Sequence, residues 1–177
     1  SSGDAGGKAV NSNASHLHLH SDASPGVGIN NNIVASYRAA TRIMTDELAS
    51  RINILTIPGI RDSFVTDHAA ERCKEYGKAI YLMDLENYDD DENRSYDDAT
   101  TAPSVRITSE KFDGRGVDNN FSATYFPNVT ITDETNGRLV KVPASIAALG
   151  AIAYNDSVAY PWFAPAGFNR GALDFVT

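Results

Sequence analysis

The sequence predicts an α/β (mixed α+β) fold in which a mixed β-sheet is flanked by helices. Helical periodicity and short apolar runs alternate along the first half of the chain, which predicts a βαβ unit over residues 52–84. The dipeptide Asn136-Gly137 lies between two alternating segments and predicts a β-hairpin over residues 125–142. With 42% hydrophobic and 21% charged residues, the 177-residue chain has the composition of one globular domain.

Charge and cysteine content argue against several classes of function. The net charge is −8 and lysines and arginines do not cluster, so nucleic-acid binding is not expected. No run of about 18 apolar residues occurs, so membrane insertion is not expected either. Cys73 is the single cysteine, which excludes an internal disulfide and permits a reducing compartment.

Residues 1–29 are rich in Ser, Gly, Asn and Ala, which predicts a flexible or loosely ordered segment before a domain at 30–177. Within the segment lies the alternating run His16-Leu17-His18-Leu19-His20. On a strand, the three histidines share one face, and imidazole is a common metal ligand, so they are candidate ligands together with Asp22. The competing interpretation is a strand with a polar face, because residues two apart rarely converge on one ion without a second element. No cofactor is predicted.

The first ordered element is predicted to be an amphipathic helix that ends near Ser50 and packs on a sheet. After capping asparagines at 30–32, apolar residues recur at helical steps: Ile33, Tyr37, Ala40, Met44 and Leu48. Residues 52–57 then read as a strand buried on both faces, which Pro58-Gly59 ends.

A second helix is predicted over residues 62–76, with Asp62 or Ser63 as its N-cap and Gly77 after its last turn. Its inner stripe comprises Val65, Ala69, Cys73 and Tyr76. Residues 78–84 form the next buried strand, and the whole has the size of a βαβ crossover.

Asp84 and Glu86 lie at the carboxyl end of that strand, at the edge where α/β proteins often bind ligands. A metal-dependent enzyme is therefore one hypothesis. The turn at residues 58–62 contains no Gly-rich phosphate loop, and His68 has no catalytic partner in view and is expected at the surface or half buried. We therefore prefer a non-enzymatic function and predict no catalytic residue.

The most acidic part of the chain is Asp89-Asp90-Asp91-Glu92 together with Asp97-Asp98. It lacks the central glycine and the closing glutamate of a calcium loop. A solvated loop is the first interpretation, and a surface that faces a basic patch on a neighbouring subunit is the second.

From Pro103 onward the pattern favours β-structure. Val105 and Ile107 are read as a strand before a turn at 113–116, and residues 122–131 are rich in β-branched and aromatic side chains. The hairpin joins 129–132 to 139–142, where Asp133 and Arg138 flank the turn and are expected to pair. Pro143 opens a helix of small apolar residues over 144–153.

Residues 161–171 contain two prolines, two glycines and three aromatic residues. Proline fixes φ and glycine permits positive φ, so the backbone there follows a set path. The aromatic side chains are expected to dock into a groove, and a docked Trp162 implies a loss of about 3–5 kcal/mol for Trp162→Ala. The predicted structural determinants are Trp162, Pro165, Gly167, Asn169 and Arg170.

This stretch resembles the signature W-x-(A/S)-P-A-G-x-N-R-G of contractile bacteriophage tail sheath proteins. Residues 142–153 resemble the preceding family run VP-x-S-x-x-x-A-G-x-x-A-R-x-D, although Leu149 stands where alanine is usual and Tyr154 where arginine is usual. Residues 125–133 resemble the family strand YYP-x-V-x-V-x-D, and residues 52–60 resemble INLL-x-x-PG.

The resemblance implies a structural subunit that polymerises around an inner tail tube and contracts to drive the tube through the host envelope. Its partners would be other sheath subunits, the inner tail tube protein, and the baseplate and tail terminator proteins. The subunit would be assembled in the host cytoplasm and belong to the virion. Sheath subunits are usually longer, so we expect a fragment truncated at the C-terminus. A type VI secretion sheath or a phage-tail-like particle is the alternative.

Overall fold

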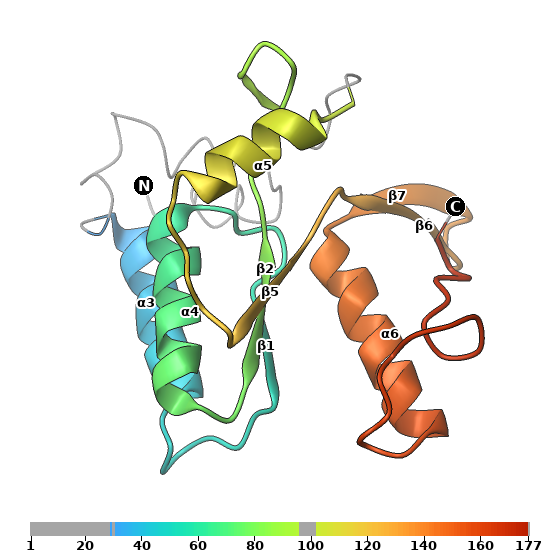
Figure 1. The fold of residues 1–177 in the computed structure, drawn as a ribbon, viewed down its shortest axis with the longest axis horizontal. Coiled ribbons are helices and arrows are strands. Elements are labelled where there is room, and N and C mark those ends of the chain that lie inside the picture. The colour runs from blue at the N-terminus through green and yellow to red at the C-terminus, as the bar shows by residue number, and fades with distance from the viewer. Residues whose placement is uncertain (1–28, 30, 96–101, 177) are drawn as a thin grey trace.

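The computed structural model describes residues 29, 31–95 and 102–176 (Figure 1). The histidine run at 16–20 and Asp97-Asp98 lie outside these residues, so the hypotheses about them remain predictions.

A three-stranded parallel sheet forms the centre of the fold. Its strands are β1 (Ile54–Thr56), β2 (Ile80–Asp84) and β5 (Ser122–Tyr125), in the order β1-β2-β5. Helix α4 (Ser63–Tyr76) connects β1 to β2, which are parallel neighbours. The predicted βαβ unit is therefore confirmed.

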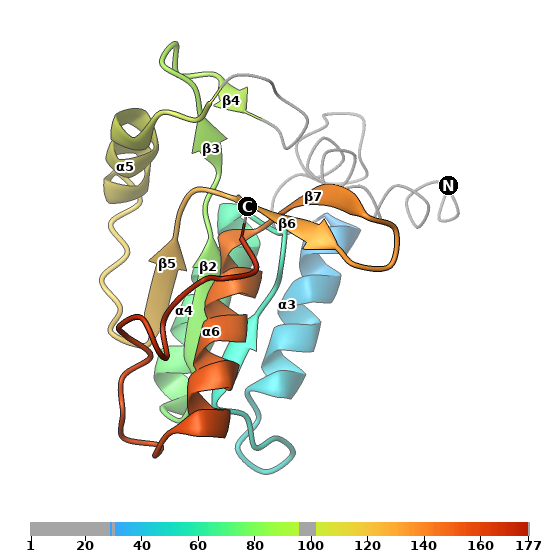
Figure 2. The same ribbon diagram turned by 90° about the vertical axis from the view of Figure 1, so that its right-hand side faces the viewer.

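Helices cover both faces of this sheet. Helix α4 packs on one face, and α6 (Ala144–Val158) packs on the other (Figures 1 and 2). Helix α3 (Asn32–Met44) packs against α4 and forms the outermost layer on that side. Because both faces are covered, β2 is buried along four of its five residues.

The sequence of α4 explains both its ends and its buried face. The side chain of Asp62 accepts a hydrogen bond from the Phe64 N–H at 2.9 Å, and Gly77 adopts φ 68° and donates to the Cys73 carbonyl. The predicted inner stripe is buried: Val65 packs with Val34 of α3 and with Ile60. The other three residues of the stripe pack with Leu55, Tyr81 and Met83 of β1 and β2. Burial raises the pKa of the Cys73 thiol to about 11.

The predicted apolar stripe of α3 is confirmed only in part: Ile33 and Tyr37 are partly buried against a core cluster, whereas Ala40, Met44 and Leu48 are exposed. The helix ends at Met44 instead of near Ser50, and the Leu48 side chain is 99% exposed. The buried residues of this face are Val34, Thr41 and Thr45. Both threonine hydroxyls donate to carbonyls one turn earlier, at 2.8 Å, so they can be buried against the polar surface of α4.

The strand predicted around Val105 and Ile107 is also wrong, because α5 (Val105–Asp113) is a helix. Ile107 and Thr108 are buried, whereas Val105 is 66% exposed. Two apolar residues at alternate positions are too short a pattern to distinguish a strand from a helix. Between β2 and α5, the short strands β3 (Asn87–Tyr88) and β4 (Arg94–Ser95) pair across the acidic residues 89–92.

The predicted hairpin is confirmed as β6 (Val129–Asp133) and β7 (Arg138–Val142), which are antiparallel. Gly137 adopts φ 62° and donates to the Asp133 carbonyl at 2.8 Å. Residues 122–125 belong to the parallel sheet, so the hairpin is shorter than predicted. The Asp133 carboxylate accepts from the backbone of Thr135 and the side chain of Asn136.

Candidate functional site

Residues 159–171, which we call the aromatic loop, follow helix α6 and carry the stretch singled out in the sequence. Their large side chains are exposed: Tyr160 by 62%, Trp162 by 75% and Phe168 by 98%. The prediction that these aromatic residues dock into a groove of their own chain is therefore wrong. Pro165, Gly167 and Asn169 are exposed as well.

The backbone of the aromatic loop is nevertheless fixed, as its prolines and glycines predict. The buried Asn155 side chain of α6 donates to the Phe163 carbonyl at 2.9 Å. Gly167 adopts φ 81°, and its carbonyl accepts from the Gly171 N–H at 2.9 Å. A Cβ on Gly171 would lie 2.8 Å from the Ala166 Cα, so this close approach requires glycine.

Ring contacts hold three aromatic residues of the loop, Tyr160, Trp162 and Phe163, in one cluster. Tyr160 and Trp162 stack with their ring centroids 4.9 Å apart and an interplanar angle of 2°. Phe163 meets both rings edge-on, at 5.7 and 6.5 Å. The Arg170 guanidinium lies over the Phe163 ring, 4.8 Å from its centroid. Arg170 therefore stabilises this cluster through a cation–π contact.

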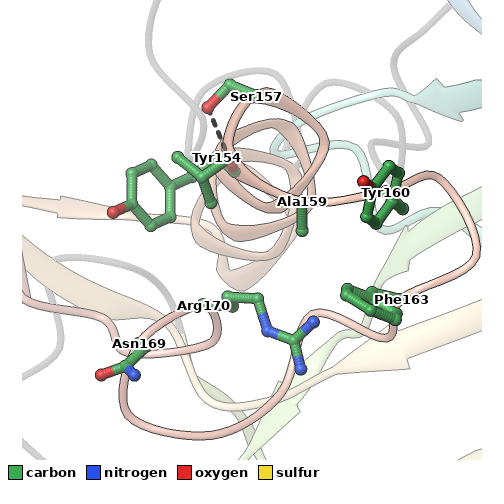
Figure 3. Close-up of a pocket in the computed structure, with 8 residues that line it drawn as sticks. Tyr154, Ser157, Ala159, Tyr160, Phe163, Asn169 and Arg170 are labelled. Carbon is green, nitrogen blue, oxygen red and sulfur yellow. Dashed lines mark hydrogen bonds between the residues drawn. The ribbon is translucent and has the colours of Figure 1, made fainter.

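Between this cluster and the end of α6 lies an open groove of about 960 Å³, which we call the aromatic groove. Figure 3 shows Tyr154 and Ser157 on α6 and the Arg170 side chain reaching toward Phe163. The lining residues are Tyr154, Ser157, Val158, Ala159, Tyr160, Phe163, Asn169 and Arg170. Among these described residues, Arg170 alone carries a formal charge. Such a groove suits apolar side chains that are accompanied by one negative group.

The carboxylate of Asp84 is committed to a structural junction. It accepts hydrogen bonds from the Gly59 N–H at 3.1 Å and the Ser145 N–H at 3.2 Å. It also accepts from the Ser145 hydroxyl at 2.9 Å, and both side chains are buried. Asp84 thus joins the ends of β1 and β2 to the N-terminus of α6, where a negative group is favoured. We call these contacts the Asp84 junction.

Glu86 is bound to other partners. It forms an ion pair with Arg94 at 3.1 Å and accepts from the Tyr88 hydroxyl at 2.8 Å. The structure therefore does not bring Asp84 and Glu86 together around one site. No group of three or more metal-binding side chains occurs within residues 31–95 and 102–176.

His68 is only 8% exposed, so it lies deeper than expected. Burial lowers the pKa of His68 below its ordinary value of 6.5, and the charges of Arg38, Arg42 and Arg72 lower it further. The Arg38 backbone acts in the opposite direction. These groups lie on α3 and α4, far along the chain from the aromatic loop.

Sequence reasoning missed Asn155 and Ser145, which fix the site and the junction. Asn155 gives no pattern signal, because its role depends on where the aromatic loop returns. Ser145 follows Pro143 at the start of a predicted helix, a position at which a hydroxyl can bind a carboxylate, but its partner lies far away in sequence.

Fold and groove together define the class: a mixed α/β protein with an exposed aromatic surface beside one helix end. No family model matches the chain, and no curated protein matches it. No described helix is both long and apolar enough to span a membrane.

Proposed function

We propose that the chain is a structural subunit of a contractile tail sheath, which polymerises around an inner tail tube and contracts to drive the tube through the host envelope. The observation that carries the proposal is the exposure of the aromatic loop, with Trp162 exposed by 75%. Contiguous exposed apolar patches usually mark protein–protein contact sites. The residues that form this patch are also those whose sequence resembles the sheath signature.

The rest of the molecule supports a mechanical function. In a contractile lattice each subunit has to move as a nearly rigid body, so contacts between its layers must not shear. The Asp84 junction fastens α6 to the sheet through two hydrogen bonds from Ser145 to one buried carboxylate, and a third bond from Gly59 ties in the turn after β1. Energy for contraction would come from the contacts between subunits, without nucleotide hydrolysis.

The proposed partners are other copies of the subunit, the inner tail tube protein, and the baseplate and tail terminator proteins. The proposed location is the tail of a virion after assembly in the host cytoplasm. The alternative is the sheath of a type VI secretion system or of a phage-tail-like particle, which would use the same surface. We do not propose a metal-dependent enzyme, because Asp84 is occupied by the junction and Glu86 by Arg94 and Tyr88.

Electron microscopy of the purified protein tests this proposal. The expected result is a field of striated tubes of uniform diameter. A folded protein that stays monomeric at high concentration, alone and with its tube protein, would contradict the proposal.

A further inference from the structure

The turn of the β6–β7 hairpin contains a chemically reactive pair of residues. Asn136 is the one asparagine of the sequence that precedes a glycine. In such a pair the glycine nitrogen can attack the asparagine side chain, because glycine carries no Cβ that hinders the approach. Asn136 and Gly137 are both exposed, and Figure 1 shows the turn at the outer edge of the molecule, away from the parallel sheet. Water therefore has access to both reacting residues.

The reaction of such a pair is deamidation, and it proceeds in two steps. The Gly137 nitrogen bonds to the Asn136 Cγ, the bond between Cγ and Nδ2 breaks, and Nδ2 leaves as ammonia with the proton of the Gly137 nitrogen. The product is a cyclic succinimide. Water then adds across one of the imide C–N bonds and opens the ring, which gives aspartate or isoaspartate. The reaction consumes only water.

Asp133 forms a hydrogen bond with each of the two reacting groups. Its backbone carbonyl accepts from the Gly137 N–H at 2.8 Å, and its carboxylate accepts from the Asn136 side-chain amide at 2.6 Å. The attack requires that the Gly137 nitrogen gives up its proton and that the Asn136 side chain turns toward this nitrogen. Both hydrogen bonds have to break for this to happen, so both oppose the reaction.

The Asp133 carboxylate is itself fixed within the turn. It accepts a further hydrogen bond from the Thr135 N–H at 3.0 Å. The hydrogen bonds from the Asn136 side chain and the Thr135 backbone lower the pKa of Asp133 below its ordinary value of 3.8. Near neutral pH the group is therefore ionised, and its negative charge further disfavours loss of the proton from the Gly137 nitrogen.

We propose that Asn136 is a site of spontaneous deamidation that Asp133 restrains, so that opening of the turn starts the reaction. This site goes beyond the proposed function and does not rest on it. Deamidation replaces the amide donor with a carboxylate that faces Asp133, and two carboxylates repel each other. Isoaspartate also adds a carbon atom to the main chain between Asp133 and Arg138, which lie opposite each other across the hairpin. The modified turn therefore cannot return to the original conformation.

Peptide mass spectrometry tests the site. The 177-residue chain is incubated near neutral pH, folded in one sample and unfolded in guanidinium chloride in another. The asparagine, aspartate and isoaspartate forms at position 136 are then separated over time. Asn169 is the internal control, because it is exposed but precedes Arg170. We expect products at Asn136 well before any at Asn169, and faster in the unfolded sample. Equal rates at both asparagines, or equal rates at Asn136 in both samples, overturn the proposal.

Substitution of Asp133 tests its restraining role. Asp133→Ala removes the carboxylate, so deamidation of the folded chain should accelerate about two- to tenfold, the effect of one hydrogen bond. Asp133→Asn keeps an acceptor oxygen and loses the charge, so its rate should lie between those of Asp133→Ala and the unmodified chain. Circular dichroism checks that both variants are folded, and the comparison of folded with unfolded chain needs no variant. Rates equal to or below that of the unmodified chain would show that Asp133 does not restrain the reaction.

Hydrogen exchange measures the consequence for the hairpin. Asn136→Asp supplies the negative charge of the product, so exchange of the Gly137 N–H should become faster, again by about two- to tenfold. Asn136→Gln is the matched control, because it keeps an amide that can donate to Asp133 and should leave the exchange unchanged. If Asn136→Asp exchanges like the unmodified chain, the turn closes again after deamidation, which would contradict the proposed irreversible change.

Discussion

The Asp84 junction and the aromatic loop use their side chains in opposite ways. In the junction, a carboxylate and a hydroxyl are buried and matched by hydrogen bonds. In the aromatic loop, large apolar rings are exposed, while the backbone is held by Asn155 and Gly167. Asp84, a candidate metal ligand in the sequence, therefore stabilises the fold. The aromatic residues, expected to pack inside their own chain, are instead available for contact with other molecules.

The largest effect is expected at the junction. Asp84→Asn replaces an acceptor with an amide that cannot accept all three hydrogen bonds, which leaves buried donors on Ser145 or Gly59. We expect the free energy of unfolding to fall by about 3 kcal/mol. Urea denaturation measures it. The matched control is Glu86→Gln, which breaks an ion pair nearer the surface and should cost about 1 kcal/mol or less. Equal losses would mean that the Asp84 junction stabilises the fold no more than the Glu86 ion pair does.

The next effect concerns the backbone of the aromatic loop. Gly171→Ala would place a Cβ 2.8 Å from both the Ala166 Cα and the Pro165 carbonyl, so the loop must shift. We expect a loss of about 1–3 kcal/mol in the free energy of unfolding. Gly150→Ala in α6 is the control, because its Cβ would meet Phe175 at an ordinary 3.6 Å. That change should stabilise the helix by about 0.5–1 kcal/mol. If both variants change the free energy of unfolding by the same amount, the backbone of the aromatic loop does not require glycine at position 171.

A third prediction concerns pH and a part of the fold outside both regions, the contact between α3 and α4. The pKa of His68 is lowered in the folded state by burial and then by Arg38, Arg42 and Arg72. The unfolded chain therefore binds a proton first as pH falls. The contribution of neutral His68 to the free energy of unfolding is fully present above pH 6.5, the ordinary pKa of histidine, and declines as pH falls below it. Hydrogen exchange at pH 7.5 and 5.5 should show this loss in α3 and α4, and His68→Gln should reduce it. The same loss in His68→Gln would assign the effect to other groups.

Local patterns in the sequence predicted much of the fold. The caps of α4, its buried stripe and the Asn-Gly hairpin were predicted correctly, because each depends on residues a few positions apart. The buried face of α3 was predicted only in part, because the second half of the helix packs through threonines on the polar surface of α4 and not on the sheet. The prediction of a strand where α5 lies was wrong, because two alternating apolar residues are too short a pattern to exclude a helix.

The candidate site was predicted only in part. The prolines and glycines of residues 161–171 predicted a fixed path, yet burial of Trp162 was assumed because large aromatic side chains usually pack inside. Whether such a ring faces its own core or another molecule depends on tertiary structure. The partners of Asp84 lie 25 and 61 residues away in sequence, so no local pattern could reveal them.

The most direct test of the central claim is Trp162→Ala, measured for stability and for association in the same preparation. Because the side chain is 75% exposed, we expect the free energy of unfolding to change by no more than about 0.5 kcal/mol. Formation of tubes, measured by sedimentation and electron microscopy, should be strongly reduced. A loss of several kcal/mol in stability with unchanged tube formation would show that Trp162 packs within its own subunit, and it would contradict the account.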